Sequence, residues 1–434
     1  MAADELTPPE RKALHDLKLK LEQSIRSNQL LLSRSISTDH KRPAFLKSRI
    51  STCASPSPEV APAAVDCGGL SLRGVPLFPT KSNRRLDAVL LRFMRAREFN
   101  ARETLEMIQR TLRWRREFAV DGITGEDLDS ECFGAAARVD GVDRDGRPVC
   151  YNEYGWAREG GVYEKAFGTK EKQERFLRWR VQFMERRIDS FKNRGDVYSG
   201  MVEVVDLKDL LCSSMKDLRS TVEKMIRIFQ DNYPDFVVKN MKINMLFSYQ
   251  IFLNVSLRQY THRALFLPLL ASRAESKFVF ARPNKVTQTL LKYIAPENIP
   301  IQYGGFKREI DDEFSGEDGR VSETFVRGGG TTLVEIPIAK PGVTVVWEVI
   351  VVGWEVAYRE EFVPDDEGSY RILIGEGKKL VRTTRNSFYI HEPGRLVLTI
   401  KNKTTKKKAI FHRSKAKPTF PCYSLPDNPA ASIS

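Results

Sequence analysis

The chain has 434 residues, of which 41% are hydrophobic, and its formal net charge is +14. A chain of this length corresponds to about two or three domains, and its excess of Lys and Arg favours an anionic partner, either a nucleic acid or an acidic membrane. The six cysteines are scattered without a Cys-x-x-Cys pair, which argues against a zinc site and a disulfide framework. The N-terminus lacks the apolar core of a signal peptide, and no run of about 18 apolar residues is present. We therefore expect a cytoplasmic protein without a transmembrane helix.

Residues 1–80 are predicted to be mostly disordered, with one short helix near the start. Leu14, Leu17, Leu21 and Ile25 recur at helical spacing after two prolines. The stretch that follows this helix is rich in Ser, Pro and Ala, and it cannot bury enough apolar surface to offset the entropy lost on ordering.

Residues 81–120 show the apolar faces of two helices. The first face contains Leu86 and Phe93, and the second contains Ile108 and Leu112. Between the helices lies the arginine-dense sequence RFMRAREFNARE. A run of charges is usually a solvated face, and this is the interpretation we give to most of these arginines.

Residues 139–306 alternate between strand-like and helix-like segments. Apolar strand patterns occur at 148–152, 201–207, 242–247 and 277–281. Between the second and third patterns, a strong helical stripe precedes Tyr233-Pro234. This alternation predicts an α/β domain with a largely parallel sheet.

The stretch 229–306 carries no nucleophile, metal-ligand cluster or phosphate loop, but it contains the parts of an apolar pocket with few polar groups. Asp235 follows Tyr233-Pro234, and Lys277 begins a strand. If the two strands are neighbours, these side chains meet at the mouth of the pocket, where a lysine can fix a phosphate as a point charge. The alternative is a surface ion pair, which contributes little stability.

Residues 307–320 are polar and acidic, and their composition predicts a linker. The segments after it are short β-rich runs separated by turn signals, which predict an antiparallel β-sandwich.

Residues 401–418 carry eight Lys or Arg and no acidic residue. This basic tail is compatible with a solvated β-edge, a nucleic-acid site or contact with an anionic membrane. Only Phe411 is aromatic in the run, so base stacking is disfavoured and we expect no nucleic-acid partner. A hairpin turn at 402–405 is expected to bring Lys401 and Lys403 close to Lys406 and Lys408, while Lys407 points to the opposite side of the strand. The membrane-binding candidates are Lys401, Lys403, Lys406, Lys407 and Lys408.

No catalytic or metal-binding motif emerges from the chain. The five histidines lack metal-ligand spacing, and no Gly-x-Ser-x-Gly elbow is present. The glycines at 328–330 are not followed by the Lys-Ser/Thr of a phosphate loop. We therefore expect no enzymatic activity, no metal ion and no cofactor other than a bound phospholipid.

Several of these segments resemble a known family. LLRFMRAREFNARETLEMIQRTLRWRREF (90–118), QDNYPDF (230–236), SKFVF (276–280) and PENIPIQYGGF (296–306) are similar to the CRAL-TRIO lipid-exchange domain with its N-terminal helical cap. The runs at 353–370 and 386–408 resemble a GOLD β-sandwich. This pairing of domains is similar to that of the plant patellins. It implies a cap at 81–120, a lipid-binding domain at 130–306 and a GOLD domain at 318–418.

The resemblance implies an α/β lipid-binding cage with a movable helix over an apolar pocket. In phosphatidylinositol-binding members an acidic residue follows the Tyr-Pro pair and a lysine follows a serine, and here these are Asp235 and Lys277. Tyr233 and Phe280 are the other expected lipid contacts. The implied function is lipid binding and transfer, with a phosphoinositide as ligand, by a peripheral membrane protein in vesicle trafficking and cell-plate formation. The alternative is a GOLD-domain scaffold that binds membrane-protein tails, with the lipid as a regulatory ligand.

The chain departs from the family pattern at three places. Asp235 replaces the usual Glu, and Phe236 stands where phosphatidylinositol binders often have Arg. In the segment 243–275 the usual Pro-Trp is missing, and the segment is longer than the family pattern. It is either an insertion beside the gate helix or an error in the sequence.

Overall fold

The computed structural model describes residues 6–30, 70–78, 83–128, 130–158, 161–193, 200–208, 216–245, 277–314, 320–353, 355–377, 380 and 383–419. The chain divides into two compact bodies, Met1–Asp140 with Arg147–Phe280 and Gly141–Gly146 with Ala281–Ser434. Within the described ranges, no helix combines the length and the apolar character needed to span a bilayer. Most of the segment 243–275 lies outside the described residues, and so do residues 31–69.

The first body opens with a helical region whose core includes residues before position 81. Its elements are α1 (Pro8–Arg26), the hairpin strands β1 (Ser71–Leu72) and β2 (Val75–Pro76), α2 (Arg84–Arg95) and α3 (Ala101–Glu117). The predicted N-terminal helix is confirmed as α1, and Thr7 and Glu10 form a capping box at its start. Leu17 and Leu21 of α1 pack with Leu72 of the hairpin and with the apolar faces of α2 and α3. The hairpin carries too few apolar residues to be recognised from the sequence.

The predicted α/β domain is confirmed, and it is built on one five-stranded sheet in the order β3-β4-β5-β6-β7. The strands are β3 (Ala137–Val142), β4 (Pro148–Glu153), β5 (Met201–Asp206), β6 (Val237–Ile243) and β7 (Phe278–Phe280). Strands β4 to β7 pair in parallel. The strand predicted at 242–247 begins earlier than expected, because the chain enters β6 directly after the turn at 233–236.

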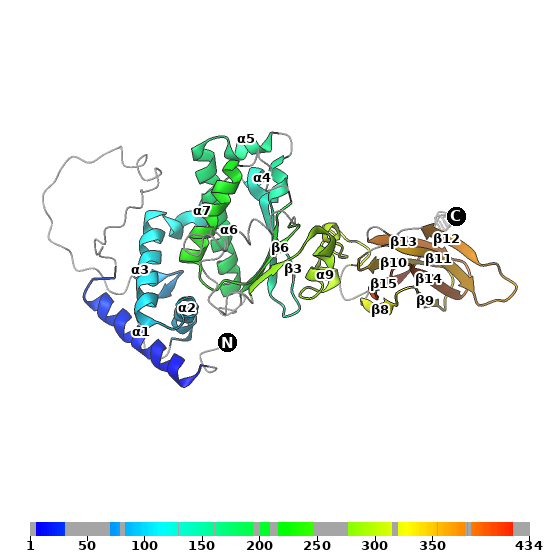
Figure 1. Ribbon diagram of the computed structural model, residues 1–434, viewed down its shortest axis with the longest axis horizontal. Helices are drawn as coiled ribbons and strands as arrows, with labels where there is room; N and C mark the ends of the chain where they lie inside the picture. Colours follow the sequence, from blue (N-terminus) through cyan, green and yellow to red (C-terminus); the bar gives the residue numbers. More distant parts are fainter. Residues whose placement is uncertain are drawn as a thin grey trace, which may run out of the picture. The chain divides into compact units, whose positions relative to one another are not determined.

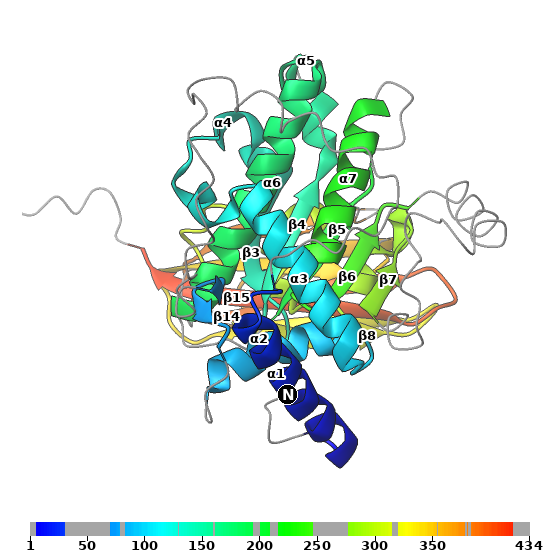
Figure 2. The same cartoon turned by 90° about the vertical axis from the view of Figure 1, so that its left-hand side faces the viewer.

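The helices of this domain are α4 (Ser130–Phe133), α5 (Val162–Phe167), α6 (Lys170–Asn193) and α7 (Lys216–Asn232). Helices α6 and α7 lie across one face of the sheet (Figures 1 and 2). Cys150, Met201 and Val205 project from that face into the same core as Trp179 and Met225.

The opposite face of the sheet carries an apolar row that crosses four strands. The strand register aligns Tyr151 with Val204, Val204 with Met241, and Met241 with Val279. Paired residues share a face, and this face is opposite to α6 and α7 because side chains alternate along each strand. Tyr151, Val204 and Met241 are fully buried. The face opposite to α6 and α7 therefore presents a continuous apolar row.

The second body contains the predicted antiparallel β-sandwich, which is confirmed. Its sheets have the orders β13-β10-β15-β8 and β12-β11-β14-β9. The strands are β8 (Ser322–Val326), β9 (Thr331–Ile338), β10 (Val343–Val351), β11 (Val356–Pro364), β12 (Ile372–Gly377), β13 (Thr384–Ile390), β14 (Gly394–Asn402) and β15 (Lys408–Pro418). Trp347 lies fully buried in the core between the sheets. A short helix, α9 (Val286–Leu290), precedes the sandwich in this body.

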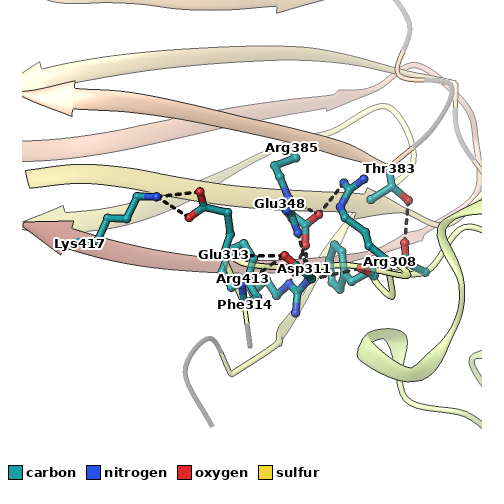
Figure 3. Close-up of polar contacts among 11 residues, drawn as sticks. Arg308, Asp311, Glu313, Phe314, Glu348, Thr383, Arg385, Arg413 and Lys417 are labelled. Atoms are coloured by element: carbon teal, nitrogen blue, oxygen red, sulfur yellow. Dashed lines mark hydrogen bonds and ion pairs between the residues drawn. The ribbon is translucent and has the colours of Figure 1, made fainter. Parts of the chain in front are cut away.

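The linker predicted at 307–320 is wrong for residues 308–314, a segment that we call the strap. Figure 3 shows the strap against the β13-β10-β15-β8 sheet. Glu348 of β10 alternates with the core residue Trp347, so it lies on the outer face of that sheet, and it is fully buried there. Arg308 of the strap donates a hydrogen bond of 2.8 Å to Glu348. Composition suggested a solvated linker, but the charges of the strap have partners on the sheet.

We predict that the strap stabilises the sandwich. A fragment of residues 320–419 should unfold at a lower temperature than one of residues 308–419, because it lacks the strap and its buried Phe314. Burial of one phenylalanine contributes about 2 kcal/mol, which corresponds to roughly 8 °C or more in melting temperature. Thermal unfolding followed by circular dichroism measures the difference. Equal melting temperatures would show that the strap lies on the sheet without stabilising it.

Candidate functional site

The site begins with the turn between α7 and β6, which consists of Tyr233, Pro234, Asp235 and Phe236. Asp235 has a φ of 60°, in the left-handed region that residues other than glycine seldom adopt. Such a conformation costs about 1–2 kcal/mol for an ordinary L-residue, so its surroundings must hold it.

Two cations flank the carboxylate of Asp235. Lys277 Nζ lies 2.6 Å from Asp235 Oδ1, and Arg95 Nη1 lies 3.2 Å from Asp235 Oδ2. The predicted contact between Asp235 and Lys277 is therefore confirmed. Its cause is the parallel pairing of β6 and β7, since the residues that precede two parallel strands meet at one edge of the sheet. The side chain of Lys277 is 40% exposed and that of Asp235 is 16% exposed, so a ligand can reach the lysine.

Two arginines of α2 belong to this site, which the sequence analysis missed. Arg92 is buried, donates a hydrogen bond of 2.7 Å from Nη1 to the carbonyl of Asp235, and lies over the Phe236 ring at 4.1 Å. Arg92 and Arg95 are exceptions to the solvated charge run that was expected for most of these arginines. Their spacing of three residues places both arginines on one side of α2. This spacing is the one feature of the sequence that indicates a shared role for the two residues.

A third arginine, Arg73, reaches the turn from the hairpin. Its guanidinium donates to the carbonyl of Asn232 at 2.7 Å and lies over the rings of Tyr233 at 4.8 Å and Phe236 at 4.4 Å. Burial lowers the pKa of Arg73 to about 10, which still leaves it charged at neutral pH. Arg73 and Arg92 therefore hold the rings on both sides of Asp235, and this fixes the strained turn.

Tyr233 lies in a buried network rather than on the apolar row of the sheet. Its hydroxyl donates to Glu185 Oε1 at 2.6 Å, and Glu185 in turn pairs with Arg115 at 2.7 Å. Burial raises the pKa of Tyr233, and the adjacent Glu185 carboxylate raises it further. The role of Tyr233 that this geometry shows is to support the turn.

Phe280 lies on the edge strand β7 and is 46% exposed. The register pairs Phe280 with Lys242, and Lys242 lies on the same face of β6 as Asn240 because the two are two residues apart. Asn240 contacts Glu203 on the face that α6 and α7 cover. Phe280 is therefore on the face that α6 and α7 cover elsewhere, not in the apolar row. The contact of Phe280 with a lipid stays a prediction.

The basic tail is arranged differently from the predicted hairpin. Strands β14 and β15 belong to different sheets, so the connection between them crosses from one sheet to the other. Lys408 is buried and donates from Nζ to the carbonyl of Gly353 at 3.2 Å, so it does not join an exposed patch. The exposed lysines at this end of the sandwich are Lys401, Lys403, Lys406 and Lys407.

The geometry around Asp235 favours binding of an anionic group. Lys277 and Arg95 supply two positive charges next to one carboxylate, and both are partly exposed. A phosphate can accept charge-assisted hydrogen bonds from both cations. In the part of the chain that the structure describes, no group of His, Cys, Asp and Glu side chains is arranged to hold a metal ion.

Comparison with known proteins gives matches along most of the chain. A model of the CRAL/TRIO domain matches residues 134–305, and a model of the Patellin-1-like C-terminal GOLD domain matches residues 327–408. Patellin-4 of Arabidopsis thaliana is 40% identical over 80% of this chain and 62% of its own length. Patellin-6 of the same plant is 33% identical, with 93% of each chain covered. The SEC14 cytosolic factor of Kluyveromyces lactis is 30% identical over 50% of this chain and 70% of its own length.

We predict that Glu185 makes the first body sensitive to acid. Burial alone raises the pKa of Glu185, but the hydrogen bond and charge of Arg115, with the charge of Arg73, lower it below the ordinary value. The stabilisation is therefore present above the unfolded pKa of about 4.3, and it is lost as pH falls through the folded value. Glu185→Gln should lower the free energy of unfolding by roughly 3–5 kcal/mol at neutral pH, because it leaves Arg115 partly unpaired.

The deficit of this variant should begin to shrink as the pH falls below the unfolded pKa, and it should be lost as the pH falls through the lower folded pKa of Glu185. Urea unfolding at several pH values measures it, and Glu117→Gln, an exposed position on α3, is the control. A deficit that stays constant with pH would contradict this assignment.

Proposed function

Because this chain belongs to the patellin family, with a CRAL/TRIO domain followed by a GOLD domain, we propose that it binds a lipid and transfers it between membranes. The observation that carries the proposal is the cationic site around Asp235 at one edge of a sheet whose outer face is apolar. The chain spans 93% of Patellin-6 but only 62% of Patellin-4, so activities of the longer relatives are part of the proposal.

A phospholipid needs two kinds of surface, and the sheet supplies both. The row of Tyr151, Val204, Met241 and Val279 is an apolar surface suited to acyl chains. Lys277 and Asp235 precede β7 and β6, so they lie at an edge of the same sheet. In the proposed complex the acyl chains lie along the apolar row, and the headgroup lies at the edge.

The proposed headgroup is an inositol phosphate. Lys277 and Arg95 bind the phosphate, while the carboxylate of Asp235 accepts hydrogen bonds from ring hydroxyls. A choline headgroup has no hydroxyl to donate and carries a positive charge, so the two cations disfavour it. Phe236 cannot replace the arginine that related binders often have at its position, but Arg92 stacks on Phe236 and brings a guanidinium to the same turn.

Membrane contact is assigned to the lysines at one end of the sandwich. Lys401, Lys403, Lys406 and Lys407 are exposed, and no ion pair involves them among the described residues. Each basic residue near an anionic surface contributes about 1 kcal/mol. We propose that the protein is cytoplasmic and associates peripherally with membranes. We propose that it acts in membrane trafficking, including cell-plate formation in cytokinesis.

We predict that Lys277→Ala slows exchange of phosphatidylinositol between vesicles by tenfold to a hundredfold. The lost charge-assisted contact corresponds to roughly 1.5–3 kcal/mol. Exchange of phosphatidylcholine should change less, because its choline is cationic and has no hydroxyl to donate to Asp235. The matched control is Lys224→Ala, an exposed lysine of α7. Equal exchange rates of phosphatidylinositol by wild type and Lys277→Ala would show that the headgroup lies elsewhere.

We predict that Lys403→Glu combined with Lys406→Glu weakens binding to phosphoinositide-containing vesicles at least thirtyfold. The loss of two attractions of about 1 kcal/mol each accounts for this factor. The matched control is Lys340→Glu with Arg371→Glu, two exposed residues at the opposite end of the sandwich. Vesicle sedimentation measures binding, which should fall as salt shortens the Debye length below ~8 Å. Equal loss in both double variants would point to net charge rather than to this patch.

A further inference from the structure

The outer face of the β13-β10-β15-β8 sheet carries more positive than negative charge where the strap lies. The sheet contributes Glu348, Arg385, Arg413 and Lys417 to this region, a net charge of 3 − 1 = +2. Arg385 and Arg413 both pair with Glu348 already, at 2.8 Å and 2.7 Å. Each of them has further donors, and these point to the strap (Figure 3).

Besides Arg308, which pairs with Glu348, three residues of the strap bind this face, two through carboxylates and one through an aromatic ring. Asp311 Oδ2 accepts from Arg385 at 2.7 Å and from Arg413 at 3.1 Å. Glu313 pairs with Lys417 through both carboxylate oxygens, at 2.7 Å and 2.8 Å.

The third residue, Phe314, is an aromatic anchor. Its ring is buried, and the guanidinium groups of Arg413 and Arg385 lie 4.1 Å and 5.2 Å from its centre. Contacts between a guanidinium and an aromatic face contribute about 0.5–2 kcal/mol each. Together, these contacts match the sequence pattern Asp-x-Glu-Phe of the strap, in which two acids precede an aromatic ring.

We propose that this face is a recognition surface for acidic–aromatic peptide segments, and that the strap occupies it as an internal ligand. The partner is a protein with an exposed segment of the Asp-x-Glu-Phe type. The two acids of the strap pair with the three cations of the sheet, Arg308 of the strap pairs with Glu348, and the guanidinium groups of Arg413 and Arg385 lie near the Phe314 ring. The inference is independent of lipid binding, since it rests only on residues 308–417.

The strap is well suited to be exchanged. The side chains of Lys417, Glu313 and Arg385 are 45%, 30% and 21% exposed, so solvent and a competing peptide can reach the ion pairs. Only a few residues of the chain separate the strap from the first strand of its own sheet. Because this tether is short, the strap has an effective concentration in the millimolar range at the surface that it occupies. A free peptide therefore binds only when the strap is weakened, and a natural partner needs higher affinity or a second contact.

The test uses the full chain and a fluorescent peptide with the sequence of residues 307–314, KREIDDEF. A released variant combines Asp311→Asn, Glu313→Gln and Phe314→Ala, which removes the two carboxylates and the aromatic ring and leaves the pair of Arg308 with Glu348. The matched control combines Glu309→Gln and Asp312→Asn, two exposed acids of the same segment. Fluorescence anisotropy should show that the released variant binds the peptide at least tenfold more tightly than wild type or the control does.

Two further comparisons establish the chemistry. Addition of Arg385→Gln to the released variant should abolish binding, and so should replacement of the peptide residues that correspond to Asp311 and Phe314 by Asn and Ala. If the released variant does not fold, Asp311→Asn alone, which keeps the aromatic ring, should still bind the peptide more tightly than wild type does. The proposal is overturned if the released variant binds no peptide or if the altered peptide binds equally well. It is also overturned if the released variant binds phosphatidylserine vesicles instead of the peptide.

Discussion

The geometry of the candidate lipid site depends on arginines that hold one strained turn. Asp235 adopts a left-handed conformation, and Arg92 binds its carbonyl from 143 positions earlier in the sequence. Arg73 approaches from the hairpin and covers both flanking rings. Without these contacts the turn would relax, and the carboxylate would no longer lie between Lys277 and Arg95. The helical region is therefore part of the site and not only a cover for the α/β domain.

Part of this site was predictable from the sequence because it follows from a local rule. Asp235 and Lys277 each precede a strand, and parallel strands bring such positions together. The contributions of Arg92 and Arg95 were not predictable in this way. A run of arginines looks the same whether it faces solvent or a carboxylate far along the chain, and only the folded packing of α2 against the turn distinguishes the two.

The sandwich shows the same limit of local patterns. Alternation of residues and turn signals predicted the strands, but they do not tell whether two successive strands pair or lie in opposite sheets. Strands β14 and β15 lie in opposite sheets, and Lys408 at the start of β15 is buried beside the carbonyl of Gly353. Composition likewise predicted a linker at 307–320, since the arginines that pair with Asp311 lie 74 and 102 positions away.

The two bodies use one physical arrangement for different ends. In each, an arginine stacks on a phenylalanine and also binds the backbone or carboxylate of a nearby aspartate, as Arg92 does with Phe236 and Arg413 with Phe314. Burial separates the fixed contacts from the exchangeable ones. Arg413 and Glu348 are almost completely buried, so water cannot replace a lost partner and the pair remains permanent. Lys277 and Lys417 are 40% and 45% exposed, and water compensates there when one anion leaves. In the proposed complexes, the exposed cations at both sites exchange an internal carboxylate for an external anion, while the buried arginines keep the fold.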